Sequence, residues 1–207
     1  MQQTALIDMI EDLKSTLDRL GHDYTLLRSS VPDTVAGVEL PKSYQLFLEH
    51  FVPNGSEIRF AQYHAVTFWT QEELESAQTP AQLRSGWLNF GSFDDQPLVL
   101  KLNESEDGDP AVYRLTAGGY PLRMGGSLFQ FLRILQLSLD MLGVLSDFDE
   151  AVPGFQEEEE MGYHDSYEDA GAMHSREEVM EEFYREVEMI DAESMDSWVL
   201  DQQGLES

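Results

Sequence analysis

Apolar positions in the first 51 residues recur with the period of an α-helix. They fall three or four residues apart from Leu6 to Leu20, and a glycine then stops the pattern. Pro41 opens a second pattern of this kind, whose apolar stripe extends from Tyr44 to Phe51. These residues therefore predict two amphipathic helices.

Between residues 57 and 124 the pattern changes to short segments that favour β-strands. Turn-forming residues such as Gly118 and Gly119 separate the segments, and Thr70 and Glu73 have the capping-box spacing of a short helix. The connections after residue 86 are too short for crossover helices, so the strands there are predicted to pair antiparallel. The predicted strands are 57–60, 65–69, 87–90, 98–102, 112–115 and 122–124.

The most apolar stretch, 128–145, predicts a long helix with Ser127 as its N-cap. Gln130, Arg133 and Gln136 share one face of this helix, so it is predicted to be an amphipathic core helix and not a membrane span. The order of elements predicts an α+β fold, with an antiparallel sheet of about four to six strands flanked by helices and a C-terminal acidic helical extension.

Charge is distributed unevenly along the 207 residues. The chain carries 12 Lys and Arg against 40 Asp and Glu, a net charge of −28, and residues 151–207 contribute −16 of it. This shift divides the chain into a domain at 1–150, an acidic linker at 151–174 and an acidic amphipathic helical tail at 175–207. The apolar face of the tail is expected to dock on its own domain or on a partner, with Trp198, Val199 and Leu200 as a second anchor.

Composition and charge exclude several kinds of function. The chain has no Cys, which rules out disulfides, thiolate catalysis and Cys-ligated metal centres. The acid excess opposes direct binding to nucleic acid or to an anionic membrane, because both are negatively charged. The N-terminal sequence has no basic start and no long apolar run, so no signal peptide is expected and a cytoplasmic location is predicted. The oligomeric state stays open.

No cofactor, metal site or catalytic residue is predicted. No two of the five His lie three to five residues apart, as zinc ligands often do. Residues 103–108 resemble the start of a calcium loop, but Arg114 stands where the bidentate Glu belongs, which favours a charged hairpin turn. Asp94 and Asp95 leave one enzymatic alternative open, acid–base catalysis on a cationic or sugar substrate.

Several blocks of the sequence resemble the SUKH superfamily, in the same order along the chain. Residues 40–48, LPKSYQLFL, are similar to its opening helix, and an Asn-Gly turn follows at Asn54. Residues 87–98 resemble its central strand–turn–strand block, 112–114 its next strand, and 127–132 its closing helix. The chain departs from the family at the central turn, where Gly-Ser-Phe-Asp-Asp replaces a Gly-Gly-Asp-like turn, and the acidic tail is not part of the common domain.

The resemblance implies an α+β domain with an antiparallel sheet and a role that needs no catalysis. Most bacterial members are immunity proteins that bind and neutralise polymorphic toxins, often nucleases, and yeast members regulate cell-wall assembly and signalling. The leading hypothesis is therefore a non-enzymatic, stoichiometric inhibitor that covers the basic active site of a cognate toxin. The alternative is a regulatory or scaffolding adaptor that docks through the tail helix.

An acidic surface steers basic partners and speeds their association, so the predicted interface combines acids with aromatic anchors. One group of candidate residues lies near the central turn and the hairpin after it, and a second group lies in the tail. The candidate partner-binding residues are Trp87, Phe93, Asp94, Asp95, Glu104, Glu106, Asp107, Asp109, Glu157, Glu158, Glu159 and Glu160.

Overall fold

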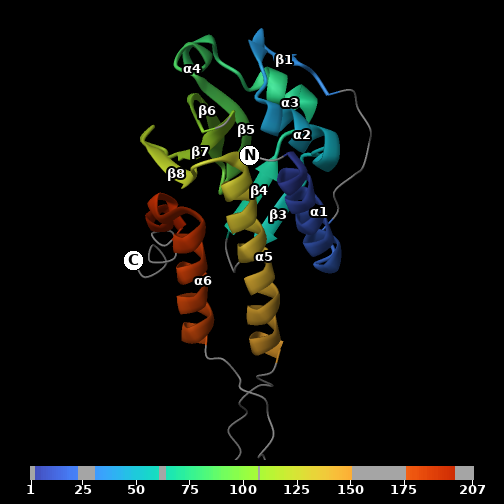
Figure 1. Ribbon diagram of the computed structural model, residues 1–207, viewed down its shortest axis with the longest axis vertical. Helices are drawn as coiled ribbons and strands as arrows, with labels where there is room; N and C mark the ends of the chain where they lie inside the picture. Colours follow the sequence, from blue (N-terminus) through green and yellow to red (C-terminus); the bar gives the residue numbers. More distant parts are fainter. Residues whose placement is uncertain (1–2, 23–30, 61–63, 107, 151–175, 199–207) are drawn as a thin grey trace, which may run out of the picture.

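Helices flank one six-stranded antiparallel sheet (Figure 1). The computed structural model describes residues 3–22, 31–60, 64–106, 108–150 and 176–198, with the side chains of 105, 106, 142–150, 176 and 177 excepted. The elements, in chain order, are α1 (Gln3–Arg19), β1 (Thr34–Val35), β2 (Val38–Glu39), α2 (Lys42–Phe51), β3 (Glu57–Phe60), β4 (His64–Phe68), α3 (Gln71–Ser76), α4 (Pro80–Arg84), β5 (Trp87–Phe93), β6 (Gln96–Glu106), β7 (Asp109–Leu115), β8 (Pro121–Gly125), α5 (Leu128–Glu150), α6 (Arg176–Asp191) and the 3-10 helix η1 (Ala192–Ser194).

The sheet is a meander in which β3 to β8 lie in chain order and each strand pairs antiparallel with the next. The α+β class, the antiparallel pairing and the six predicted strands are thereby confirmed. The small β1–β2 hairpin and α4 were not predicted. Each strand of the hairpin has two residues, too few to leave an alternating pattern. For α4, Thr79 as the cap and Pro80 in the first turn are ordinary helix-start signals that the sequence analysis missed.

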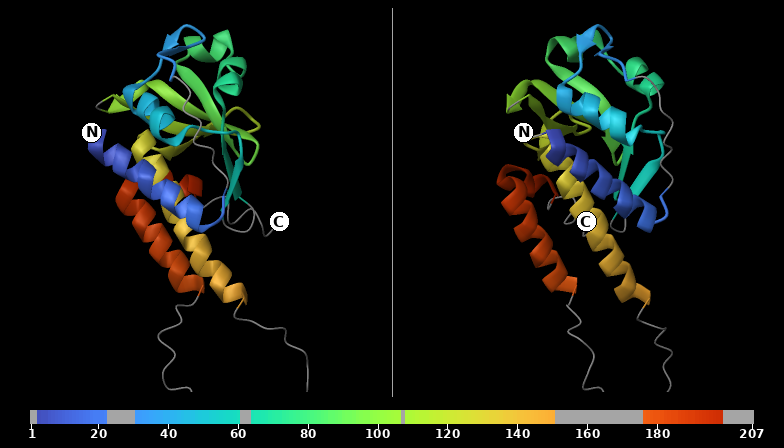
Figure 2. Two further views of the ribbon diagram at one scale, coloured as in Figure 1. Left: turned by 90° about the vertical axis from the view of Figure 1, so that its right-hand side faces the viewer. Right: turned by 45° about the vertical axis from the view of Figure 1, so that its right-hand side comes forward.

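The helices α2 and α5 pack against one face of the sheet, which we call the core face, and α1 packs against both of these helices (Figure 2). Aromatic rings fill the space between these layers. The ring centroids of Phe47 and Phe68 are 5.0 Å apart, those of Tyr44 and Phe90 are 5.7 Å apart, and Phe131 of α5 meets Phe90 edge-on at 6.2 Å. Such ring pairs add stability to a core beyond what the burial of their apolar surface contributes. The core therefore lies where the periodicity of the first two predicted helices placed their apolar stripes.

On the opposite, outer face of the sheet, the segment from α3 to α4 packs against β5, where the Asn89 side-chain amide donates to the Ala77 carbonyl at 3.0 Å. Thr70 closes the predicted capping box of α3, because its hydroxyl accepts from Glu73 N and its own N–H donates to the Glu73 carboxylate. The side-chain amide of Gln78 then pairs with the backbone of Asn89, donating to its carbonyl at 2.8 Å and accepting from its N–H at 3.1 Å. This amide clip imitates a strand–strand pairing, and Val99, which pairs with Asn89 on the same face, is fully buried, whereas Trp87 and Tyr113 are half-buried.

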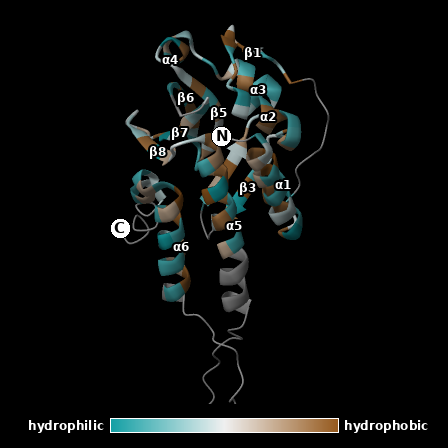
Figure 3. Ribbon diagram, in the orientation of Figure 1, coloured by the Kyte–Doolittle hydropathy of each residue, from teal (hydrophilic) through white to brown (hydrophobic). Residues whose placement is uncertain are grey.

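The helix of the predicted tail packs on α5 and shares the main core. Val179, Phe183 and Val187 are buried on its inner side, and Figure 3 shows polar positions interleaved with them along α6. Trp198 is 5% exposed, and its indole N–H donates to the carbonyl of Met124 at 3.1 Å. The tail helix thus docks on its own domain, one of the two outcomes that the sequence left open, with Trp198 as the second anchor; Val199 and Leu200 lie outside the described residues.

Three polar contacts hold the end of α6 against β8, the residue that follows it and α5. The Asp191 carboxylate accepts from Gly126 N at 2.6 Å and from the Arg123 guanidinium at 3.3 Å. The Gln130 amide of α5 donates to the carbonyl of Ile190 at 2.7 Å. Among the residues that the structure describes, no helix is long and apolar enough to cross a membrane.

Candidate functional site

The predicted interface acids are divided between the two ends of β6. Asp94 and Asp95 form the turn before this strand, and Glu104 lies near its other end. β6 has 11 residues, so at roughly 3.3 Å per residue its ends are about 30 Å apart. The fold therefore does not join these acids into one patch. Asp107, Glu157, Glu158, Glu159 and Glu160 lie outside the described residues, as does the side chain of Glu106.

Asp94 holds its own turn together and is largely engaged within the fold. Asp94 and Asp95 have φ values of +49° and +62°, as the two central residues of a type I′ hairpin turn do. The Asp94 carboxylate accepts from Ala65 N at 2.8 Å and meets His64 Nδ1 at 2.8 Å, and the Arg114 guanidinium lies 3.9 Å away. Asp95, in contrast, is exposed.

Phe93 is a core residue, and its predicted role as a surface anchor is wrong. Its side chain is 2% exposed, with Trp198 against it at 5.6 Å and the Arg114 guanidinium 4.9 Å from its ring. The cause is a β-bulge between Asn89 and Gly91, which shifts the alternation of β5 by one residue. Without the bulge, strict alternation would put Phe93 on the same face as Trp87.

Asp109 is also buried, at 2% exposed, so it does not belong to an exposed acidic patch. Its carboxylate accepts from the backbone N–H groups of Leu128 and Phe129, both at 3.2 Å, at the first turn of α5. Ser127 acts as the predicted N-cap beside it, with its hydroxyl accepting from Gln130 N at 3.1 Å. Burial raises the pKa of Asp109, although these hydrogen bonds oppose the rise. The Asp109 side chain thus serves the helix start.

Two predicted residues do meet on the outer face, where they join two that the sequence analysis missed. The Trp87 ring stands edge-on to Tyr113 at 5.3 Å, and Lys101 Nζ lies 3.8 Å above the Trp87 ring. The Tyr113 hydroxyl donates to the exposed Glu104 carboxylate at 2.7 Å. We call Trp87, Lys101, Glu104 and Tyr113 the outer-face cluster.

The outer-face cluster depends on strand register. Trp87 pairs with Lys101 across β5 and β6, and Tyr113 pairs with Val99 across β6 and β7. Burial and the hydrogen bond to Glu104 raise the pKa of Tyr113 to about 12, so its hydroxyl stays protonated and donates at neutral pH. The β-favouring pattern was visible in the sequence, but only the pairing shows that these side chains adjoin.

The candidate calcium loop and the candidate acid–base pair can both be compared with the structure. Within the described ranges, no group of three or more His, Asp or Glu could hold a metal ion. Within the segment at 103–108, the described residues 103–106 belong to β6, which pairs with β7 from Glu106 and Asp109 onward, as the charged-turn interpretation predicted. Asp94 and Asp95, the candidate acid–base pair, differ in environment, since one is tied to His64 and the other is exposed.

Comparisons with protein families, curated proteins and solved structures test whether these features belong to a known group. None of the three found a match: no family model, no curated protein and no solved structure is similar to this chain. The resemblance of its sequence blocks to the SUKH superfamily therefore stays a prediction.

Proposed function

We propose that the protein is a non-enzymatic binding domain that holds a basic protein partner through its outer-face cluster. The observation that carries this proposal is the pair of Trp87 and Tyr113, half-buried and partly accessible on the outer face of the sheet beside the exposed Glu104. Aromatic side chains supply much of the binding energy in protein interfaces when their surroundings exclude water. Their polar edges also suit a surface that is wet before binding.

The net charge of −28 supports a basic partner. A strongly charged surface attracts a surface of opposite charge over about one Debye length, roughly 8–10 Å at ionic strengths of 0.1–0.15 M. It therefore raises the association rate more than it strengthens the final contact. Salt should slow association accordingly, while the aromatic contact governs how long the complex lasts.

The partner that we propose is a toxin whose basic active site the domain covers, which makes the protein an immunity protein. The sequence blocks at 40–48, 87–98 and 127–132 support this role by their resemblance to the SUKH superfamily. Inhibition by coverage needs only a stable surface. Action in the cytoplasm is part of the same proposal, because a chain without Cys needs no oxidising compartment to fold.

The adaptor alternative loses its expected docking element. That alternative relied on the apolar face of the tail helix, yet Val179, Phe183 and Val187 are buried against the protein's own core. An adaptor would have to release α6 or bind through another surface. We therefore favour binding through the outer face.

Affinity capture with the full chain, at low and high salt, tests the proposal. We expect one basic partner, recovered less efficiently at high salt, whose toxic activity is suppressed in an equimolar mixture. Trp87→Ala should weaken that complex by roughly 30-fold, the loss typical of an interface hot spot. Tyr120→Ala removes an aromatic side chain that is 74% exposed at the β7–β8 turn and should leave affinity unchanged. Capture that is insensitive to Trp87→Ala would contradict the proposed surface.

A further inference from the structure

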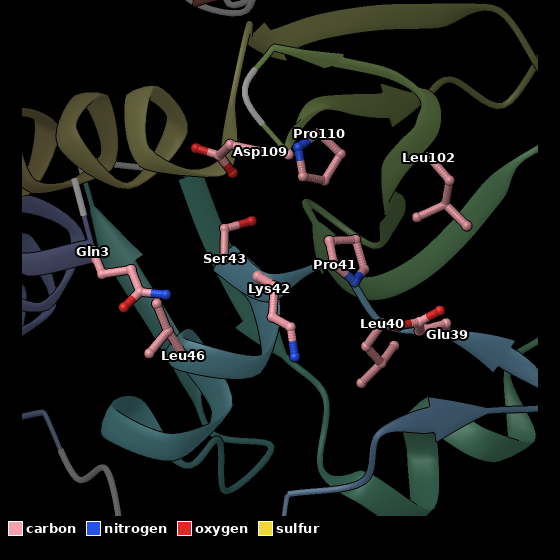
Figure 4. A pocket seen from close by; sticks show the side chains of 11 residues that line it. Gln3, Glu39, Leu40, Pro41, Lys42, Ser43, Leu46, Leu102, Asp109 and Pro110 are labelled. Carbon is pink, nitrogen blue, oxygen red and sulfur yellow. The ribbon is translucent and has the colours of Figure 1, made fainter. Parts of the chain in front are cut away.

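A cavity of about 540 Å³ opens where the start of α2 faces the β6–β7 hairpin (Figure 4). Its volume falls within the range of ligand pockets. Much of its wall is apolar and comes from separate parts of the chain. The apolar lining residues are Leu40, Pro41, Leu46, Leu102 and Pro110.

Two buried polar groups line the same cavity. The Ser43 side chain is 4% exposed, and its hydroxyl has no hydrogen-bond partner among the described residues. Asp109 is 2% exposed and lies close enough to this hydroxyl for it to lower the pKa of the carboxyl, although the two form no hydrogen bond of ordinary geometry. Figure 4 shows both side chains beside the opening, with Pro41 and Leu102 farther across it. A buried hydroxyl without a partner is costly, so it marks a place for a polar ligand atom.

The charge at the cavity favours a cationic group. Asp109 receives two backbone N–H bonds, from Leu128 and Phe129. The Ser43 and Ser127 hydroxyls also lie close enough to lower the pKa of its carboxyl. The exposed Glu39 adds a second carboxylate at the rim. Lys42 also lines the cavity, but its ammonium group donates to the side-chain oxygen of Gln45 at 3.0 Å.

We propose that this cavity receives the guanidinium side chain of an arginine presented by the basic partner. Asp109 and Ser43 would accept its N–H groups, and the apolar wall would surround its methylene stem. Arginine suits the site better than lysine, because its planar fork offers five donors and is less strongly hydrated. The source of the arginine rests on the proposed function; the chemistry of the site does not.

The cavity and the outer-face cluster lie at the same end of β6. Lys101 belongs to the cluster and Leu102 to the cavity, and consecutive strand residues point to opposite faces. The two sites therefore lie on opposite faces of the sheet near the β6–β7 hairpin, and a partner that contacts both must extend around that hairpin. The two sites can be tested separately, because no residue is shared between them.

The first test uses the blocked amino acid N-acetyl-L-arginine amide as the probe and the isotope-labelled full chain as the receptor. We expect the backbone amide resonances of Ser43, Gly108 and Asp109 to shift in NMR spectra, with a dissociation constant on the order of 1 mM for a ligand of this size. The matched neutral probe, N-acetyl-L-citrulline amide, should bind at least about tenfold more weakly, because it lacks the charge. Equal binding of the two probes, or shifts spread over the acidic surface, would overturn the inference.

Variants locate the binding. Asp109→Asn and Ser43→Ala should each weaken the arginine probe, the first by about tenfold. Asp95→Asn removes an exposed carboxylate at the far end of β6 and is the matched control, with no effect expected. Because Asp109 also caps α5, Leu102→Trp provides a second route, since it fills the cavity and leaves the acids in place. Binding that survives Leu102→Trp would refute the cavity as the site.

Two further comparisons separate the source of the arginine from the proposed function. If free L-arginine binds about tenfold more tightly than the blocked form, the ligand is a free amino acid and the partner-borne arginine is wrong. If Trp87→Ala abolishes partner binding while Leu102→Trp leaves it unchanged, the proposed function stands and this inference fails. Loss of partner affinity in both variants supports the two together.

Discussion

The two ends of β6 carry similar acidic turns, but the fold uses them in opposite ways. At the β5–β6 turn, Asp94 binds Ala65 and His64, and its neighbour Phe93 is buried in the core. At the β6–β7 end, Glu104 stays exposed and holds Tyr113 beside Trp87 on an open face. The first end stabilises the fold and the second is available to a partner. An acid in a turn is therefore informative about binding only once its hydrogen-bond partners are known.

Alanine variants of Phe93 and Trp87 give the strongest test of the difference between the two ends of β6. Phe93→Ala should lower the free energy of unfolding by about 3–5 kcal/mol, because it leaves a cavity among core rings. Trp87→Ala should lower the free energy of unfolding much less than Phe93→Ala does, because the Trp87 ring is half-buried. It should weaken partner binding more than Phe93→Ala does. Chemical denaturation and partner titration on both variants measure the two effects. Similar stability losses would erase the distinction between the two ends.

Asp94 and Asp95 offer a sharper test within one turn. Asp94→Asn should destabilise the protein by about 1–3 kcal/mol, because it removes the charge that His64 and the buried Arg114 face. Asp95→Asn should change stability by less than about 0.5 kcal/mol, as expected at an exposed site. Asn tolerates positive φ, so neither change strains the turn. Equal losses, measured by denaturation at neutral pH, would show that the Asp94 contacts do not stabilise the turn.

Asp109 makes a prediction about pH at the β6–β7 end. Its folded pKa is raised above the unfolded value near 3.8, so the folded state binds the proton more tightly. Its contribution to stability is therefore fully present below that unfolded value and is lost as pH rises through the folded pKa. The stability of the wild type relative to Asp109→Asn should fall over this window, and the carboxyl carbon of Asp109 should titrate by NMR above the usual Asp range. If the stability of the wild type relative to Asp109→Asn rises with pH instead, burial does not raise the pKa of Asp109.

The smallest expected effect concerns Tyr113. Glu104→Gln should lower the pKa of Tyr113 from its value of about 12, because the carboxylate opposes ionisation of the phenol beside it. Burial, the larger cause, should keep that pKa above the usual value of 10. Ultraviolet absorbance during an alkaline titration, compared with Tyr113→Phe to identify the signal, measures the change. An unchanged pKa of Tyr113 in the variant would mean that the hydrogen bond from its hydroxyl to Glu104 does not form in solution.

Most of the fold could be predicted from local pattern, whereas only part of the candidate site could. The stripe from Tyr44 to Phe51 lies on α2, the strand at 57–60 is β3 as predicted, and the Thr70 capping box begins α3. Trp87 and Glu104 were named from composition and neighbourhood, and the fold brings them together through Tyr113. Lys101 and Tyr113 were missed, because their role depends on which residues lie opposite them in β5 and β6.

The sequence by itself determined the class of fold, because helix and strand periods and turn residues act over a few neighbours. It also determined the net charge of −28, on which the proposal of a basic partner rests. Tertiary structure alone decided which acids are free. Gly91 shows why: a Cβ there would lie 2.3 Å from the Thr67 carbonyl oxygen of β4, so the bulge at this glycine depends on a neighbouring strand. The bulge turns Phe93 inward, and a long-range contact with the start of α5 buries Asp109.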